Sequence, residues 1–148
     1  MCIRDSPSAD LVIGAVLRPG DRAPTLVSEE LVKQMQPGSV IVDVAIDQGG
    51  CIATSRETTH TDPVVTIHGV QHYAVGNMPG AVPYTSTEAL VSVTLPYIPA
   101  IAGRGLIEAV TGRPELVSGL NTVGGSVCHP GVAKALGVGN RHPMACLN

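Results

Sequence analysis

The chain has 148 residues, of which 44% are hydrophobic and 14% are charged, a composition typical of about one globular domain. A formal net charge of −3, with nine Lys and Arg spread along the chain, excludes the basic surface that binds nucleic acid or an anionic membrane. With no Phe, no Trp and only three Tyr, the core must be built from Val, Ile, Leu and Ala, which favours an α/β fold over a β-sandwich.

The cysteines and the N-terminal residues indicate in which cellular compartment the protein is expected. The four cysteines form no CxxC pair, so we expect small buried hydrophobes in a reduced, cytoplasmic setting. No apolar run reaches the roughly 18 residues of a membrane span, so we expect no membrane partner. The octet MCIRDSPS, residues 1–8, lacks the apolar centre of a secretory signal and fits no later pattern. We expect it to be a cloning or assembly scar, with the natural chain beginning further upstream.

Two apolar runs on either side of an amphipathic segment predict a βαβ unit. Residues 9–17, ADLVIGAVL, and 39–46, SVIVDVAI, are short and nearly continuous apolar runs, which predicts buried strands. Between them, SEELVKQM at 28–35 predicts a helix with Ser28 as its N-cap and acidic residues in its first turn. Strand, helix and strand in this order predict a right-handed crossover within a parallel sheet.

Weaker patterns mark the elements that follow. The runs at 64–70 and 72–75 predict further strands. Thr85 and Glu88 have the spacing of a capping box, which predicts a helix over 85–102, kinked at its two interior prolines.

The C-terminal part alternates glycine-rich joints with short helical pieces at 113–120 and 129–137. After the octet, we therefore divide the chain into a sheet-containing domain, residues 9–84, and a helical region, residues 85–148.

Three segments follow predicted strands and contain glycine. They are AVLRPG at 15–20, AIDQGG at 45–50 and AVGNMPG at 74–80. In an open parallel sheet, ligands bind beyond the carboxyl ends of the strands, and glycine lets the backbone approach them closely. The sequence therefore predicts that these segments converge on one site.

Two carboxylates in IVDVAIDQGG, residues 41–50, have different expected roles. Asp43 and Asp47 are four residues apart, which places them on one face of a strand, Asp43 in its middle and Asp47 at its rim. A buried Asp43 must be hydrogen-bonded, which gives it a structural role. Asp47 meets both ligand and water at the rim and is the candidate acid–base residue. Position alone supports equally well that Asp47 caps a turn with Gln48 and Gly49.

Two further patterns do not predict sites. His68 and His72 have the spacing of a helical metal pair, but Gly69 and the preceding β-branched run argue against a helix. We expect two surface histidines and no metal site. The fragment GVGNRH, residues 137–142, begins like a dinucleotide fingerprint but lacks its third glycine and follows a helix.

Five blocks of the sequence together resemble the alanine dehydrogenase family: ADLVIGAVLRPG, PGSVIVDVAIDQGG, TSRETTH, HYAVGNMPGAVPYTST and TLPYI. The resemblance runs from about Ala9 to Gly137, and DVAIDQGG and NMPGAVP are its most specific blocks. It implies the distal half of a Rossmann-like NAD-binding domain, followed by C-terminal helices that pack back on a substrate domain. The family's substrate domain, catalytic histidine and glycine-rich fingerprint lie upstream of the region matched here, so we expect the chain to be a fragment that is inactive alone.

The family resemblance also implies a reaction, a cofactor and an assembly. The reaction is the NAD-dependent interconversion of L-alanine with pyruvate and ammonium, in a cytoplasmic homo-oligomer, a hexamer in the family. Asp47 is implied to be the acid–base carboxylate beside the nicotinamide, moving protons together with the upstream histidine. The residues implied to contact the cofactor are Val16, Leu17, Val44, Ala45, Ile46, Asp47, Arg56, Val75, Gly76, Asn77 and Met78. Gly76 stands where alanine is more usual, which is expected to loosen its loop.

Two alternatives stay open at this point. The NAD-binding subunit of nicotinamide nucleotide transhydrogenase is a related module that binds the cofactor without deaminating a substrate. Its corresponding strand usually ends in Glu, so Asp47 favours the dehydrogenase. An inert truncated product is the other alternative. The choice between NAD and NADP is open too, because the family's ribose-reading acid lies upstream.

Overall fold

A computed structural model describes residues 3–147 of the chain. The chain forms two compact units, Met1–Ala81 and Val82–Asn148, with a boundary slightly before the one expected after residue 84. The first unit contains the four-stranded sheet, and the second is mainly helical. Each unit is described by itself below.

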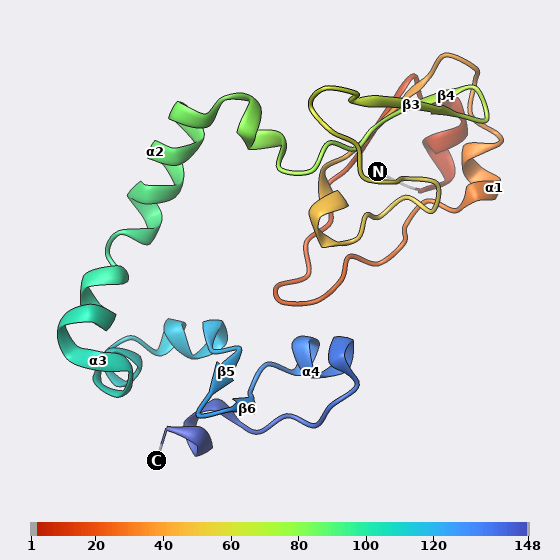
Figure 1. Ribbon diagram of the computed structural model, residues 1–148. Coiled ribbons are helices and arrows are strands. Elements are labelled where there is room, and N and C mark those ends of the chain that lie inside the picture. Colours follow the sequence, from red (N-terminus) through yellow and green to blue (C-terminus); the bar gives the residue numbers. More distant parts are fainter. Residues whose placement is uncertain (1–2, 148) are drawn as a thin grey trace. The chain divides into compact units, whose positions relative to one another are not determined.

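The first unit is built on a mixed sheet with the spatial order β1-β2-β4-β3, and Figure 1 shows its strands β3 and β4 side by side. Strand β1 pairs with β2 and β2 with β4 in parallel, whereas β3 is an antiparallel edge strand. With helix α1 between β1 and β2 in the chain, the predicted βαβ unit and α/β class are confirmed. The bounds are β1 (Leu11–Gly14), α1 (Glu29–Val32), β2 (Val40–Asp43), β3 (Val64–Ile67) and β4 (Val70–Tyr73).

Strand β2 ends earlier than predicted. It stops at Asp43, and the chain continues as the 3₁₀ helix η2 (Val44–Gln48). The Asp43 carboxylate accepts a hydrogen bond from the Ala45 N–H, 3.2 Å, and thereby caps η2. The predictions that Asp43 lies mid-strand and that it shares a strand face with Asp47 are therefore wrong.

Helix α1 begins as predicted and ends early. The Ser28 side chain accepts a hydrogen bond from the Leu31 N–H, 3.4 Å, which confirms the predicted N-cap. Beyond Val32 the backbone tightens, because the Gln34 and Met35 amides donate to carbonyls three residues earlier. The helix is consequently shorter than the predicted 28–35.

The core of the first unit covers one face of the sheet. On the other face, Leu11 and Ile13 of β1 are 51% and 54% exposed. Val12, on the opposite side of the same strand, is buried, as is its β2 partner Ile41. The buried core residues are Val12, Val27, Val32, Met35, Ile41, Ala45, Cys51, Ile52 and Val70.

The two histidines of the first unit occupy different environments. His68 lies in the tight turn between β3 and β4, where it and Gly69 both have positive φ, so the spacing with His72 is not helical. His72 is 1% exposed, because it points to the covered face of β4, beside Ile41 of β2. Its ring bonds the Thr54 hydroxyl at 2.8 Å and the Val70 carbonyl at 3.0 Å. The expectation of two surface histidines is therefore wrong for His72.

The second unit begins with two helices separated by a break. Helix α2 (Pro83–Thr94) starts at a proline and has no side-chain cap, so the predicted capping box of Thr85 and Glu88 is wrong. Proline at the first helical position fixes φ in advance and sets the start instead. The predicted kink appears as a break at 95–97, after which α3 (Ile98–Gly112) runs beyond the predicted end at residue 102.

The remainder of the second unit consists of short elements. They are η4 (Pro114–Gly119), β5 (Thr122–Val123), β6 (Ser126–Val127), α4 (Pro130–Leu136) and η5 (Pro143–Cys146). The helix predicted at 129–137 is confirmed as α4, which is capped by the His129 ring and ends at the left-handed Gly137. Cys128 is buried, Cys146 is half-buried, and Cys2 lies outside the residues that are described.

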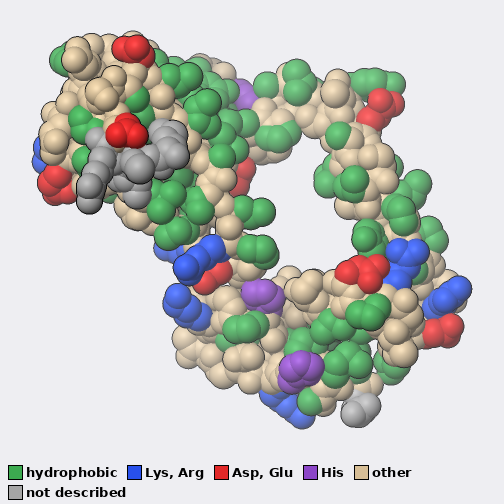
Figure 2. Space-filling view, turned by 180° about the vertical axis from the view of Figure 1, so that it is seen from behind, with side chains coloured by type: hydrophobic (Ala, Val, Ile, Leu, Met, Phe, Trp, Pro, Cys, Tyr) green, Lys and Arg blue, Asp and Glu red, His purple; other side chains and the backbone are tan. Residues whose placement is uncertain are grey.

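One helical stretch in the described part of the chain, Pro83–Gly112, is long and apolar enough by length and composition to cross a membrane. The lengths of the apolar runs in the sequence had predicted none. The stretch is broken at 95–97 and distorted again at Gly105, so neither α2, with 12 residues, nor α3, with 15, reaches the ~20 residues of a spanning helix. Many of its apolar side chains are exposed (Figure 2), among them Tyr84, Leu90, Val93, Leu95, Ile98 and Ile107.

Candidate functional site

A pocket of about 190 Å³ lies at the carboxyl ends of β1 and β2. It brings together two of the three segments that the sequence analysis singled out, 15–20 and 45–50. Its lining residues are Ala15, Val16, Leu17, Val44, Ala45, Asp47 and Gln48. Five of the predicted site residues, Val16, Leu17, Val44, Ala45 and Asp47, therefore share one pocket.

The third segment reaches the pocket through Asp47. The Asn77 N–H donates to Asp47 Oδ1 at 3.0 Å, which joins the loop after β4 to helix η2. Asn77 has a φ of 52°, in the left-handed region that asparagine adopts more readily than most residues. Asp47 is exposed, so the contact with Asn77 leaves part of its carboxylate open to solvent.

The remaining predicted residues lie outside this pocket. Ile46 and Val75 are buried, which turns their side chains away from a ligand at the surface. Arg56 is exposed, and Met78 is half-buried at the start of the 3₁₀ helix η3 (Met78–Ala81). None of these four side chains lines the pocket that contains Asp47.

Gly76 fits closely against a neighbouring carboxylate. A Cβ atom at this position would clash with the Oε1 atom of Glu57, a flexible and exposed side chain. An alanine at position 76 therefore requires Glu57 to move. Glycine at position 76 therefore leaves room for the Glu57 side chain. The sequence had predicted only that Gly76 loosens its loop.

Gln48 is a pocket residue that the sequence reasoning missed. Its Oε1 atom is buried and has no hydrogen-bond partner among the residues described. A buried amide oxygen without a donor costs about 1–3 kcal/mol. The one sequence feature that could have identified Gln48 is its position directly after Asp47. We had considered Gln48 only as a turn residue.

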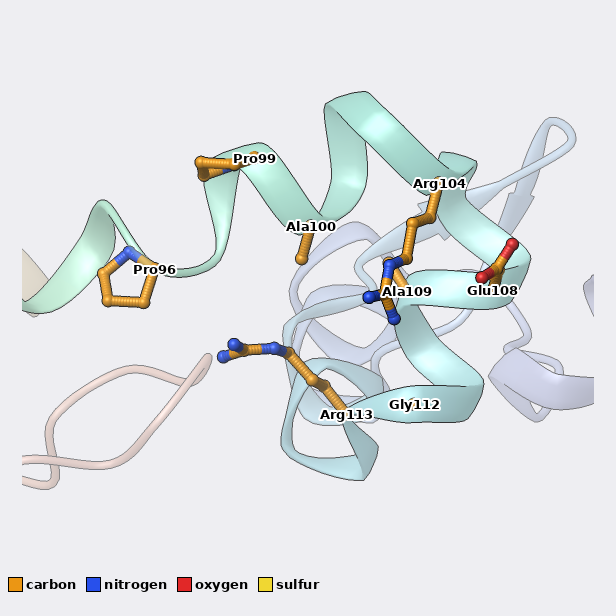
Figure 3. A pocket seen from close by; sticks show the side chains of 8 residues that line it. All are labelled: Pro96, Pro99, Ala100, Arg104, Glu108, Ala109, Gly112 and Arg113. Carbon is orange, nitrogen blue, oxygen red and sulfur yellow. The ribbon is translucent and has the colours of Figure 1, made fainter.

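A larger cavity, about 340 Å³, lies within the second unit (Figure 3). The Arg104 and Arg113 side chains extend from α3 and its end toward the cavity, and the Arg113 guanidinium lies 5.3 Å from the centre of the Tyr97 ring. The cavity contains none of the predicted site residues. In residues 3–147, no group of three or more His, Cys, Asp and Glu is arranged to hold a metal ion.

Comparisons with known proteins give the family. The model of the family described as alanine dehydrogenase/PNT, C-terminal domain, matches residues 3–130. This range includes most of the octet that we had expected to lie outside the resemblance.

The curated relatives are alanine dehydrogenases. That of Bacillus subtilis (strain 168) is 59% identical over 130 residues, which are 87% of this chain and 34% of the relative. That of Methanococcus maripaludis is 60% identical over 128 residues, 86% of this chain and 34% of the relative. The chain thus spans about a third of the length of these relatives.

Solved structures similar to this chain include an alanine dehydrogenase and a transhydrogenase. An L-alanine dehydrogenase matches with a TM-score of 0.73 and 48% identity, over 93% of this chain and 39% of that one. A transhydrogenase from Sinorhizobium meliloti matches with a TM-score of 0.60 and 27% identity, over 70% and 29%. The similarity to the dehydrogenase is greater by every one of these measures. The chain therefore belongs to the alanine dehydrogenase/PNT C-terminal domain family.

Proposed function

We propose that this chain is the part of an NAD-dependent L-alanine dehydrogenase that binds the nicotinamide half of the cofactor, with Asp47 as the acid–base carboxylate. The observation that carries the proposal is the position of Asp47. It lies in the pocket between the loops after β1 and β2, and it is held by the loop after β4. Loops that meet at the carboxyl ends of parallel strands are where α/β proteins bind ligands.

The residues of the pocket fit a nicotinamide. Val16, Leu17 and Val44 offer apolar surface for a flat ring. The unpaired Gln48 Oε1 is an acceptor for a carboxamide N–H, which a turn of the Gln48 amide toward the pocket would bring into reach. When bound, NAD supplies the hydride acceptor for oxidation of the substrate.

The chemistry assigned to Asp47 follows from its hydrogen bonding. Its Oδ1 atom is occupied by the Asn77 N–H, and this contact orients the carboxylate. The Oδ2 atom of an exposed carboxylate is then available to accept and return a proton. In the overall reaction, L-alanine, NAD and water give pyruvate, ammonium and NADH.

The family resemblance implies that the rest of the active site lies in a part of the relatives that this chain does not span, since the chain covers about a third of their length. We therefore propose that the 148-residue chain alone forms no NADH from alanine, and that activity requires the regions of the relatives that this chain does not match. By the family resemblance, the complete enzyme is a cytoplasmic homo-oligomer.

The proposal is tested in a chimera. Residues 9–130 replace the matching segment of the Bacillus subtilis enzyme, and Asp47→Asn is then introduced. Turnover should fall by roughly 10²-fold or more, the scale of losing a positioned acid–base group, with cofactor affinity and thermal stability nearly unchanged. Asp62→Asn, a change at an exposed carboxylate outside the pocket, is the matched control and should leave turnover intact. Near-normal turnover in Asp47→Asn, or unfolding as its sole defect, would show that Asp47 is not the acid–base group.

The alternative is a module that binds nucleotide without deaminating anything, and it is supported by the likeness to the transhydrogenase. The unmodified chimera separates the two functions. If it binds NAD but forms no pyruvate from alanine, the transhydrogenase-like function is favoured.

A further inference from the structure

The Asp43 carboxylate is the most heavily hydrogen-bonded side chain near the pocket. It has no exposed surface. Its oxygens accept from the N–H groups of Ala45, at 3.2 Å, Cys51, at 3.0 Å, and Ile52, at 3.3 Å. The Cys51 thiol donates to the same carboxylate at 3.4 Å.

These donors come from the two ends of one segment. The chain leaves the sheet at Asp43, passes through η2, and returns beside the same carboxylate at Cys51. Within the segment, the Gly49 N–H donates to the Ile46 carbonyl at 2.9 Å, and the Gly50 N–H donates to the Ala45 carbonyl at 3.0 Å. Residues 43–52 therefore form a ring that the Asp43 carboxylate closes, which we call the Asp43 ring.

Two glycines leave room for the closure. A Cβ atom on Gly50 would lie 3.0 Å from Asp43 Oδ2, and Gly50 has a φ of 77°, so both space and backbone favour glycine. A Cβ atom on Gly14, at the end of β1, would clash with the Cys51 sulfur. Burial, together with the adjacent Asp43 carboxylate, raises the pKa of Cys51 to about 11, so at neutral pH the thiol keeps the proton that it donates.

Asp47 is part of the Asp43 ring and lies in its helix η2. It is exposed, and the one hydrogen bond recorded for its side chain is the contact with the Asn77 amide. The position of its carboxylate therefore depends on the backbone of η2, whose start is capped by Asp43. We propose that Asp43 is a positioning residue, which fixes Asp47 against the loop after β4 by closing the Asp43 ring. Its catalytic consequence rests on the function proposed for Asp47, whereas the geometric coupling of Asp43 to Asn77 does not.

The coupling is tested by amide hydrogen exchange followed by NMR, on the complete 148-residue chain. Asp43→Asn keeps the size of the side chain but turns an acceptor into an NH₂ donor that faces backbone N–H groups. Exchange should accelerate at least tenfold at Cys51, Ile52 and Asn77, while the amide of Ile41, in the centre of β2, keeps its protection. In the control Asp47→Asn, exchange should accelerate at Asn77 and stay slow at Cys51 and Ile52. Unchanged exchange at Asn77 in a folded Asp43→Asn variant would overturn the proposal.

A glycine pair tests the coupling if Asp43→Asn fails to fold. Gly49→Ala and Gly50→Ala both place alanine at a left-handed φ, 94° and 77°, so their backbone costs are similar. The new methyl group at position 50 meets Asp43 Oδ2, whereas the one at position 49 meets side-chain carbons of Arg22 at 4.0 Å. Gly50→Ala should accelerate exchange at Asn77 several-fold more than Gly49→Ala. Equal effects would rule out control of Asp47 and Asn77 by Asp43.

Activity of the chimera then gives the catalytic consequence. Asp43→Asn should lower kcat about tenfold or more, because a shift of about 1 Å in a catalytic group can reduce the rate by 10²-fold. Cys51→Ser, which keeps a donor beside Asp43, should retain most of the activity. If exchange at Asn77 responds as expected but kcat is unchanged, the assignment of Asp47 as the acid–base group is at fault, and the positioning by Asp43 stands. If kcat falls in Asp43→Asn without faster exchange at Asn77, the positioning role is wrong.

Discussion

The two units differ in how they bury their apolar residues. The first packs Val, Ile and Met side chains from strands, α1 and loops into one core. In the second, the buried hydrophobic residues are Ala109, Val110, Cys128 and Ala133, which are mostly small, and most of the large apolar side chains of α2 and α3 are exposed. The first unit therefore draws its stability from its own interior. The helices of the second rely more on local effects, such as proline at a helix start, and leave much of their apolar surface exposed.

The largest difference in stability between the two units is expected for a substitution in the core of the first. Ile41→Ala removes a fully buried side chain from the centre of β2, and we expect a loss of about 2–5 kcal/mol in the free energy of unfolding. Leu90→Ala in α2, where the side chain is 63% exposed, should change stability by no more than about 0.5 kcal/mol. Urea unfolding followed by circular dichroism measures both variants. A comparable loss in Leu90→Ala would mean that α2 is buried in solution.

The apolar surface of the second unit can be measured directly. We expect the chain to bind a hydrophobic dye such as ANS, since Leu90, Val93 and Ile98 are exposed on neighbouring turns. Replacing Leu90 and Val93 by Glu should reduce the dye fluorescence several-fold and reduce self-association in sedimentation experiments. The matched pair Thr61→Glu and Gln71→Glu, at exposed polar positions of the first unit that are not cross-strand partners, should leave the fluorescence unchanged.

Helix starts provide a smaller contrast. Ser28→Ala removes the side-chain cap of α1 and should destabilise the first unit by about 0.5–1 kcal/mol, the lower part of the usual range, because the bond is long at 3.4 Å. Thr85→Ala should have little effect, since Thr85 lies inside α2 and does not cap it. Thermal unfolding compares the two. A larger loss in Thr85→Ala would restore the capping box that the structure contradicts.

The smallest effect that we predict is a pH dependence due to His72. Burial lowers the pKa of His72 from its usual value, so between the lowered value and about 6.5 the unfolded chain binds more protons than the folded one. Stability from this residue is therefore complete above pH 6.5 and falls as the pH is lowered below it. His72→Gln should flatten the change in Tm between pH 7.5 and pH 5.5. An equal slope in the variant would assign that pH dependence to other groups.

Local patterns predicted the elements of the first unit better than their ends. Apolar runs identified the strands, and Ser28 identified the start of α1. The end of β2 was missed because the Asp43 carboxylate caps the following turn, a competition that hydrophobic periodicity does not contain. The burial of His72 was missed because it depends on which face of β4 the core covers.

For the candidate site too, the sequence predicted some features and not others. Strand order predicted that three loops converge near Asp47, and the pocket and the Asn77 contact show this convergence. The burial of Ile46 and Val75 depends on side-chain packing and was not predictable from their places in the sequence, next to Asp47 and Gly76 respectively. The unpaired oxygen of Gln48 has no sequence signature, because it is defined by the absence of a donor in three dimensions.

The Asp43 ring has a consequence for how the sequence can change. A loop whose two ends are held by one buried carboxylate needs little from its exposed positions to stay closed. Val44 and Asp47 are exposed on η2, whereas Ala45 and Ile46 are buried. Evolution or protein engineering can therefore change the exposed residues of η2 together and so select a new chemistry. Strand β2 and the hydrogen bonds of Asp43 that close the ring would stay the same.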